Sequence, residues 1–333
     1  MTDTSQLENA RPPHTPVMID QVLAALDLQP GTVVVDATYG RGGYTTRFLQ
    51  AADCRVIAVD RDPEAIAHAR TAAESLAGRL TPIQACFGDL ASVIDSVVGG
   101  PVDAIAMDLG VSSPQLDDAR RGFSFRYDGP LDMRMGTTGP TAADLVNTLD
   151  EADLAAIIRD LGEERHARRV ARTIVERRRE TPFSTTADLG NVIRSVVRRA
   201  RDGIDPATRT FQALRLQVND ELGELDRGLV AAEKLLRPGG RLAVVSFHSL
   251  EDRRVKHFLA DRSGRRAGGS RHMPAASDAF ETKAPTFELI TRKALIPSEA
   301  EQKSNPRARS ARMRAALRTS APAWSDSHSG EAA

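Results

Sequence analysis

Three aspartates that each end a run of apolar residues are the first candidates for chemistry in this sequence. Asp36, Asp60 and Asp108 close the runs VVVD, RVIAVD and VDAIAMD. Apolar runs rich in β-branched residues are typical of buried parallel strands, and a parallel α/β sheet binds ligands beyond the carboxyl ends of its strands. The sequence therefore predicts that these carboxylates lie along one ligand-binding edge.

A glycine-rich loop follows the first of these runs and indicates a nucleotide-like cofactor. Gly40, Gly42 and Gly43 in the stretch YGRGGYTT allow the backbone to turn tightly and to approach a ligand closely. The helix expected to begin here offers its free N–H groups to that ligand. Asp60 is placed to accept hydrogen bonds from ribose hydroxyls. Both NAD and S-adenosylmethionine suit these features.

Two residues near the loop separate the two cofactors. The dinucleotide pattern G-x-G-x-x-G needs a third glycine at position 45, where this chain has Thr45. Asp36 would repel a pyrophosphate, but it could face the cationic amino-acid end of S-adenosylmethionine directly or through water. S-adenosylmethionine is therefore favoured, and an NAD-dependent dehydrogenase is the weaker alternative. Phe87, after the third strand, either borders the adenine or packs in the core.

Asp108 is also the candidate catalytic residue of a methyl transfer. Cys54 and Cys86 are expected in or beside buried strands, so attack through a covalent cysteine adduct is not expected. A carboxylate that accepts an N–H of an exocyclic base amine would favour its reactive geometry and stabilise the developing charge. We expect Asp108 to contact the cofactor, the acceptor amine or both, with Ser112 and Ser113 as polar support.

Further substrate contacts are expected from a histidine and from arginine-rich segments. His248 follows the fifth predicted strand and either touches substrate or caps the next helix. Residues 165–179 contain seven arginines and one acid, and clustered arginine attracts a phosphate backbone. The alternative is a solvated helix face. The residues that we select as RNA contacts are Arg168, Arg169 and Arg172, with the basic segment 303–318 as a second candidate.

The order of the expected elements defines the fold class. Strands and helices alternate up to residue 110, as in a doubly wound parallel sheet. From about 116 to 213 only a loop and helical patterns occur, and a long helix is expected from about 206 to 236. Strands return at 241–249 and 286–293. The prediction is a Rossmann-like α/β sheet with an all-helical domain inserted between its fourth and fifth strands.

The expected division of the chain follows from this order. A flexible leader (1–13) precedes the first part of the sheet domain (14–115). The inserted helical domain (116–213) comes next, and the second part of the sheet domain (214–318) contains a mobile Gly-, Ser- and Arg-rich loop (263–283). A disordered tail (319–333) ends the chain.

Composition excludes several classes of protein. The 333 residues include 45 basic and 45 acidic ones and are 41% hydrophobic, which is typical of a globular protein. We expect no membrane span, because there is no apolar run of about 18 residues, and no secretory signal. Two cysteines, both expected to be reduced, indicate a cytoplasmic protein. The histidines show no metal-ligand spacing, so no metal site is expected.

Several long motifs resemble the bacterial RsmH (MraW) methyltransferase family. The motifs that carry the resemblance include DATYGRGG, DLGVSSPQLD, GEERHARRVARTIVERR, PATRTFQALRLQVNDEL and PGGRLAVVSFHSLEDR. The resemblance implies a class I S-adenosylmethionine-dependent methyltransferase sheet with an inserted helical domain. It also implies N4-methylation of a cytidine in the decoding (P-site) region of 16S ribosomal RNA, by direct attack of the exocyclic amine. The implied partner is 16S rRNA or the small ribosomal subunit.

The resemblance also implies a set of cofactor contacts. They are Gly42, Gly43, Tyr44, Asp60, Phe87, Asp108 and Gln115. The family most often has GRGGHS where this chain has GRGGYT. A contact through the backbone N–H of Tyr44 would survive that change, whereas one through an imidazole would not. A non-catalytic ribosome-assembly factor that keeps S-adenosylmethionine as a structural ligand is the alternative, and the aspartates at strand ends argue against it.

Overall fold

The computed structural model describes residues 16–199, 203–265 and 283–325. The expected leader (1–13) and most of the expected loop (263–283) lie outside these residues. Within them, no helix is both long and apolar enough to cross a membrane.

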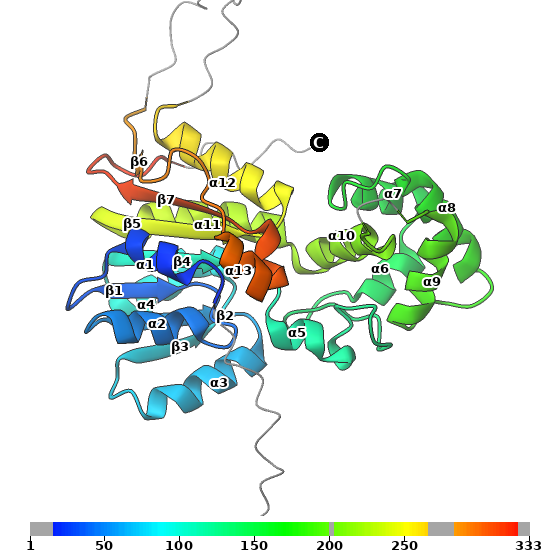
Figure 1. The fold of residues 1–333 in the computed structure, drawn as a ribbon, viewed down its shortest axis with the longest axis horizontal. Helices are drawn as coiled ribbons and strands as arrows, with labels where there is room; N and C mark the ends of the chain where they lie inside the picture. The colour runs from blue at the N-terminus through cyan, green and yellow to red at the C-terminus, as the bar shows by residue number, and fades with distance from the viewer. Residues whose placement is uncertain (1–15, 200–202, 266–282, 326–333) are drawn as a thin grey trace, which may run out of the picture.

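The described residues form a seven-stranded sheet in the order β3-β2-β1-β4-β5-β7-β6 (Figure 1). Its strands are β1 (Val33–Asp36), β2 (Arg55–Asp60), β3 (Leu80–Gln84), β4 (Val102–Asp108), β5 (Leu236–Ser246), β6 (Phe287–Leu289) and β7 (Arg312–Arg318). Strands β1 to β5 run parallel, and β7 is antiparallel to both of its neighbours. The predicted doubly wound sheet is confirmed.

Helices cover both faces of this sheet. Those that flank it are α1 (Ile19–Leu26), α2 (Gly43–Ala51), α3 (Pro63–Glu74), α4 (Leu90–Val98), α11 (Glu221–Leu235) and α12 (Ser249–Arg262). Successive strand residues point to opposite faces. Val34 therefore packs with α1, α2 and α3, while Val35 packs with α4, α11 and α12. Both faces are buried, which explains why the strands are continuous apolar runs.

A group of helices stands to one side of the sheet and has a hydrophobic core of its own (Figure 1). After the short α5 (Ser113–Asp117), its helices are α6 (Ala142–Thr148), α7 (Glu151–Asp160), α8 (Ala167–Arg178), α9 (Thr186–Val196) and α10 (Ala207–Asn219). Side-chain caps explain several starts, because Thr141, Asp150 and Thr185 each accept a backbone N–H of the first turn. The boundary expected at 213/214 falls within α10.

The long helix expected from about 206 to 236 is two helices. Asp220 has a left-handed conformation with φ 48° and separates α10 from α11. This break turns the chain from the insert back to the sheet. Periodicity alone did not reveal it, because both helices keep a helical pattern up to the junction.

The basic segment 303–318 is also different from its prediction as a phosphate-binding tail. Residues 312–318 form β7, in which Met313, Ala315 and Ala316 are buried. Arg314 is bidentate to Asp252 at 2.8 and 3.0 Å, and Arg318 is buried with bonds to backbone oxygens. These arginines hold the sheet edge together.

The tail expected to be disordered from 319 is ordered as far as residue 325. Thr319 N donates to Thr286 O at 2.9 Å. Trp324 Nε1 donates to Ala284 O at 2.9 Å, and the guanidinium carbon of Arg262 lies 4.2 Å from the Trp324 ring centroid. These contacts fix the segment against α12. Residues 326–333 of the expected tail lie outside the described ranges.

Candidate methyl-transfer site

A cavity of about 590 Å³ lies at the carboxyl ends of β1, β2 and β4. One part of its wall comes from the loops after these strands. Another part comes from the insert and α11, including Gln212, Arg215 and Glu221. Its position is the one expected for a ligand of a doubly wound sheet.

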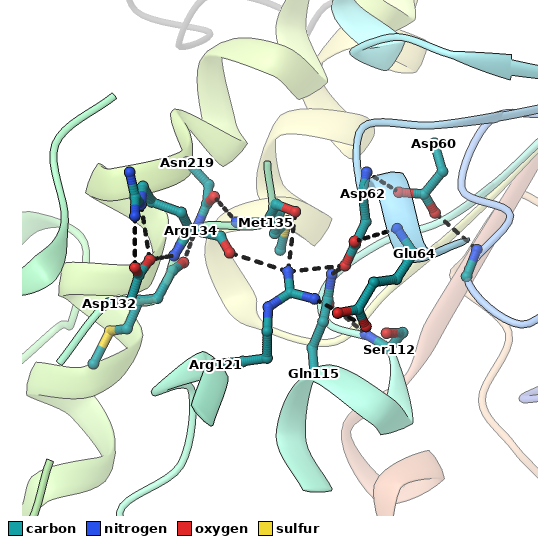
Figure 2. A network of polar contacts seen from close by, with 12 residues as sticks. Asp60, Asp62, Glu64, Ser112, Gln115, Arg121, Asp132, Arg134, Met135 and Asn219 are labelled. Carbon is teal, nitrogen blue, oxygen red and sulfur yellow. Dashed lines mark hydrogen bonds and ion pairs between the residues drawn. The ribbon is translucent and has the colours of Figure 1, made fainter. Parts of the chain in front are cut away.

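Asp60 lies on this cavity and organises the glycine loop. Its carboxylate accepts Gly40 N at 2.8 Å with Oδ2 and Asp62 N at 2.8 Å with Oδ1 (Figure 2). Burial raises the pKa of Asp60. The carboxylate therefore fixes the loop after β1 against the start of α3, and its remaining lone pairs are available to a ligand.

The neighbouring glycines do different work. Gly42 has φ 73°, and a Cβ there would lie 2.6 Å from Tyr39 Oη, so only glycine fits this turn. Gly42 does not line the cavity, whereas Gly40 and Gly43 do. A Cβ on Gly43 would lie 2.7 Å from Pro16 Cγ. Of the two glycines predicted to contact the cofactor, the structure places only Gly43 on the cavity wall.

Tyr44 and Phe87 line the cavity and are also held by the protein. The Tyr44 hydroxyl donates to Val17 O at 2.6 Å, and burial raises the pKa of this phenol well above its usual value. Phe87 packs closely on α11, because a Cβ on Gly228 would lie 2.6 Å from Phe87 Cδ2. Each ring therefore combines a position on the cavity with packing between elements.

Asp36 does not reach the cavity, so its expected contact with a cationic ligand is wrong for this structure. The residue is fully buried, and its Oδ2 accepts the Thr45 hydroxyl at 2.7 Å. Burial raises the pKa of Asp36 to about 6. The residue that breaks the dinucleotide pattern, Thr45, thus joins the end of β1 to α2.

Asp108 presents an acceptor without a protein partner. Its backbone N–H bonds to Thr38 Oγ1 at 2.7 Å, but among the described residues nothing donates to its buried Oδ1. Burial, followed by the charges of Asp36 and Glu251, raises the pKa of Asp108 well above its usual range. Asp108 lines the cavity, and an orphaned buried acceptor at such a place indicates a ligand.

Gln115 lies on the cavity and joins the loop after β4 to α3. Its Nε2 donates to Asp62 Oδ2 at 2.8 Å, and its Oε1 accepts Ser112 N at 2.9 Å (Figure 2). Arg121, from the start of the insert, lies 2.9 Å from the same Asp62 oxygen. Ser112 and Ser113 also line the cavity, and Ser113 Oγ accepts a hydrogen bond from Arg307.

His248 caps the helix that follows it, which was one of its two expected roles, and it also lies on the cavity wall. As the N-cap of α12, its Nδ1 accepts Glu251 N at 3.4 Å. Its Nε2 lies 3.0 Å from Glu251 Oε1 but is not aligned for a hydrogen bond. Burial opposes ionisation of Glu251, but the contacts with His248 and Arg215 outweigh it and lower the pKa of this acid.

The predicted RNA-binding arginines lie away from the cavity. Figure 1 places α8 at the side of the insert remote from the sheet. Arg168, Arg169 and Arg172 are exposed there. Arg172 Nε lies 3.6 Å from Glu151 Oε1, and Arg169 bonds to Val196 O. The structure separates these arginines from the cavity.

A charged pair on the insert side of the cavity is not among the residues predicted from the sequence. Arg215 of α10 donates to both carboxylate oxygens of Glu221 at 2.7 and 2.8 Å, and both residues line the cavity. Their sequence context, LRLQVNDEL, is an ordinary amphipathic pattern. Nothing in this pattern tells which helix faces the sheet edge.

The described residues also contain no group of three or more His, Cys, Asp or Glu arranged to hold a metal ion.

Three features together define the class of this protein. The sheet is parallel except for β7, a glycine loop follows β1, and an acid ends β2. They define a Rossmann-like fold of the class I S-adenosylmethionine-dependent methyltransferases. Residues 11–319 match the model of the MraW methylase family. The chain belongs to this family.

Curated relatives agree with this assignment. The Ribosomal RNA small subunit methyltransferase H of Rhodospirillum rubrum is 57% identical over 324 residues, which cover 97% of this chain and 99% of the relative. The protein of the same name from Rhodospirillum centenum is 59% identical over 310 residues and 93% of each chain. A third, from Caulobacter vibrioides, is 55% identical over 313 residues, 94% of this chain and 97% of the relative.

Proposed function

We propose that this protein transfers a methyl group from S-adenosylmethionine to the exocyclic N4 amine of a cytidine in the decoding (P-site) region of 16S ribosomal RNA, in the cytoplasm. The observation that carries the proposal is Asp108, which lines the cavity with a buried carboxylate whose Oδ1 has no donor among the described residues. The names of the relatives support ribosomal RNA of the small subunit as the substrate.

The cavity suits a cationic cofactor with a ribose. Its wall includes five carboxylates, which are Asp60, Asp108, Glu221, Glu224 and Glu251. The arginines there number four, Arg41, Arg61, Arg215 and Arg307. This near balance leaves no excess of positive charge to attract a pyrophosphate. Asp60 is placed for ribose hydroxyls and Phe87 for the adenine, with Gly43, Tyr44 and Gln115 lining the same space.

The residues present can support direct attack by an amine. When bound, S-adenosylmethionine supplies an electrophilic methyl group on a sulfonium sulfur. Asp60 and Phe87 would hold this cofactor, which would give up its methyl group to the amine nitrogen and leave as a neutral thioether. An oxygen of the Asp108 carboxylate accepts one amine N–H beforehand, which orients the lone pair. The same oxygen then takes the proton that the nitrogen loses, and the raised pKa of Asp108 favours this.

Substrate RNA must present a single base to this cavity. A base in a structured RNA has to leave its stack to reach an enclosed site. Ser112, Ser113 and His248 line the cavity and are candidates for contacts with the target nucleotide. Arg168, Arg169 and Arg172 are candidates for remote phosphate contacts, because they are exposed at the far side of the insert.

The test measures methyl transfer from labelled S-adenosylmethionine to naked 16S rRNA and to isolated small subunits, followed by mapping of the modified base. We expect label on N4 of one cytidine. Label on another base type contradicts the proposal. Tight binding of S-adenosylhomocysteine without any transfer would instead favour the alternative, a ribosome-assembly factor with a structural ligand.

A further inference from the structure

Arg215 lines the cavity, and its guanidinium is held in a fixed orientation with one terminal nitrogen left unused by the protein. Its Nε and Nη2 are committed to Glu221, and only 16% of the Arg215 side chain is exposed. Within the described ranges, its second terminal nitrogen, Nη1, donates to no protein atom. Nη1 is not sealed from solvent either, so it remains accessible to a ligand. Because a guanidinium is planar, fixing two nitrogens also fixes the third.

Asp108 Oδ1 is the complementary feature of the same cavity. It is an acceptor without a protein donor, and Arg215 Nη1 is a donor without a protein acceptor. The two residues belong to one electrostatic cluster, since the charge of Glu251 acts on Asp108 and the charge of Arg215 acts on Glu251. A ligand between them would meet an acceptor at one place and a donor at another.

The charges around Arg215 select the kind of ligand group. Glu221 neutralises the guanidinium, and Glu251, which is 3% exposed, adds a second carboxylate to the cluster. An RNA phosphate brought to this place would meet more negative than positive charge. A neutral group with a lone pair, such as a carbonyl oxygen or a ring nitrogen, avoids this repulsion and still uses the free N–H groups.

We propose that Arg215 reads the acceptor edge of the target base, its O2 and N3, while Asp108 holds the N4 amine, and that Glu221 is the positioning residue of Arg215. The inference rests on the proposed function and names how the base is selected. Cytosine places a donor next to two acceptors on this edge. Uracil would set O4 against the Asp108 carboxylate and its N3–H against Arg215. Such a mismatch of buried polar groups is strongly rejected.

The first experiment compares Arg215→Lys with the unaltered enzyme in methyl transfer to small subunits. Lysine can still pair with Glu221 but cannot keep a second donor in a fixed plane. We expect kcat/KM to fall by about 10- to 100-fold, the loss typical of one charged hydrogen bond, with unchanged affinity for S-adenosylhomocysteine. Arg262→Lys is the matched control, because Arg262 pairs with Glu233 and its side chain is 18% exposed, much like that of Arg215, but it does not line the cavity. It should leave kcat/KM unchanged.

A second variant separates recognition from folding. Arg215→Met combined with Glu221→Leu replaces the buried pair by apolar side chains, which usually preserves folding. It should bind S-adenosylhomocysteine as the unaltered enzyme does and should lose kcat/KM at least as much as Arg215→Lys. Transfer at the normal rate by this folded variant would overturn the inference.

Base analogues and the salt dependence of KM test whether Arg215 contacts the base or a phosphate. Small subunits reconstituted with 3-deazacytidine or 2-thiocytidine at the target position weaken one acceptor at a time. If Arg215 contacts the base, the losses from Arg215→Lys and from at least one analogue are not additive. Additive losses with both analogues overturn the inference. It is also overturned if Arg215→Lys reduces the slope of log KM against log salt concentration by about one, which is the signature of a lost phosphate contact.

The two proposals fail in distinguishable ways. Absence of transfer by the unaltered enzyme would refute the proposed function, and this inference with it. Normal transfer that is indifferent to Arg215 would refute the inference alone.

Discussion

Replacing Asp108 by asparagine should abolish most activity while making the protein more stable. The substitution keeps the shape of the side chain but removes the charge of a buried group whose Oδ1 has no donor among the described residues. Asparagine keeps an unpartnered oxygen but removes the cost of ionising a buried group, which exceeds the cost of about 1–3 kcal/mol for a neutral unsatisfied group. The free energy of unfolding near neutral pH should therefore rise by at least about 1 kcal/mol. In a chain of this length such a gain corresponds to only a few degrees in Tm.

The pH dependence of this gain has a definite sign. Burial and neighbouring carboxylates raise the folded-state pKa of Asp108, so the folded protein holds the proton more tightly than the unfolded chain does. Destabilisation by this group is therefore absent below the unfolded pKa, grows as pH rises toward the folded pKa and is complete above it. The stability difference between Asp108→Asn and the unaltered protein should accordingly be largest at high pH and vanish in acid.

Activity should move in the opposite direction. A general base contributes about 10²- to 10⁴-fold to a rate, so kcat for methyl transfer should fall by that order. The assays are chemical denaturation between pH 5 and 8 and single-turnover transfer of labelled methyl to small subunits. A variant with near-normal kcat would refute the role of Asp108 in taking the amine proton. A variant that is less stable at high pH would refute the claim that its carboxylate is buried without compensation.

Three further substitutions test the cavity and the insert. Gly42→Ala forces a side chain into a left-handed turn against Tyr39, and it should cost about 1–3 kcal/mol of stability and weaken S-adenosylhomocysteine binding in calorimetry. Tyr44→Phe removes the hydroxyl bond to Val17 and should lower the free energy of unfolding by about 1 kcal/mol, while Kd for S-adenosylhomocysteine changes little if the tyrosine contacts it through its backbone; a large rise in Kd contradicts that. The third change places alanine at three exposed positions of α8, which are Arg168, Arg169 and Arg172. It should weaken RNA binding and flatten its salt dependence while S-adenosylhomocysteine binding stays intact. An unchanged RNA affinity would identify an ordinary surface.

The sheet half of the site could be predicted because strand ends are visible in the sequence. Asp60 and Asp108 close continuous apolar runs, and parallel strands bring such ends to one edge. The position of Asp36 was predicted wrongly because the alternation of side chains along β1 also applies to its last residue, which is Asp36. It shares the face of Val34, which α2 covers, so its carboxyl points beneath that helix and meets Thr45.

The insert half of the site could not be predicted from the sequence. Helical periodicity identifies which side of α10 is apolar, but not where the helix lies relative to the sheet. Arg215 lies on α10, just before the break at Asp220 that the helical pattern does not reveal, and it lines the cavity. Strand β7 was missed for a related reason. Its short apolar stretch is interrupted by Arg314, and only the partner Asp252 on α12 makes that arginine compatible with a half-buried strand.

Recognition of the base by Asp108 and Arg215 requires that the insert be held at a fixed distance from the sheet. Arginines on either side of the cavity contribute to that connection, and two of them lie next to α3. Arg61, at the end of β2, donates to Asn219 O at 2.7 Å, and Arg121, from the insert side, lies 2.9 Å from Asp62 at the start of α3. Arg61 itself lines the cavity, whereas Arg121 does not, and Figure 2 shows the contact of Arg121 with Asp62. Since hydrogen bonding weakens steeply with distance and angle, a small shift of α10 would separate the Arg215 donor from a base held by Asp108. The selectivity of the proposed reaction therefore depends on these connecting arginines as well as on the residues that touch the base.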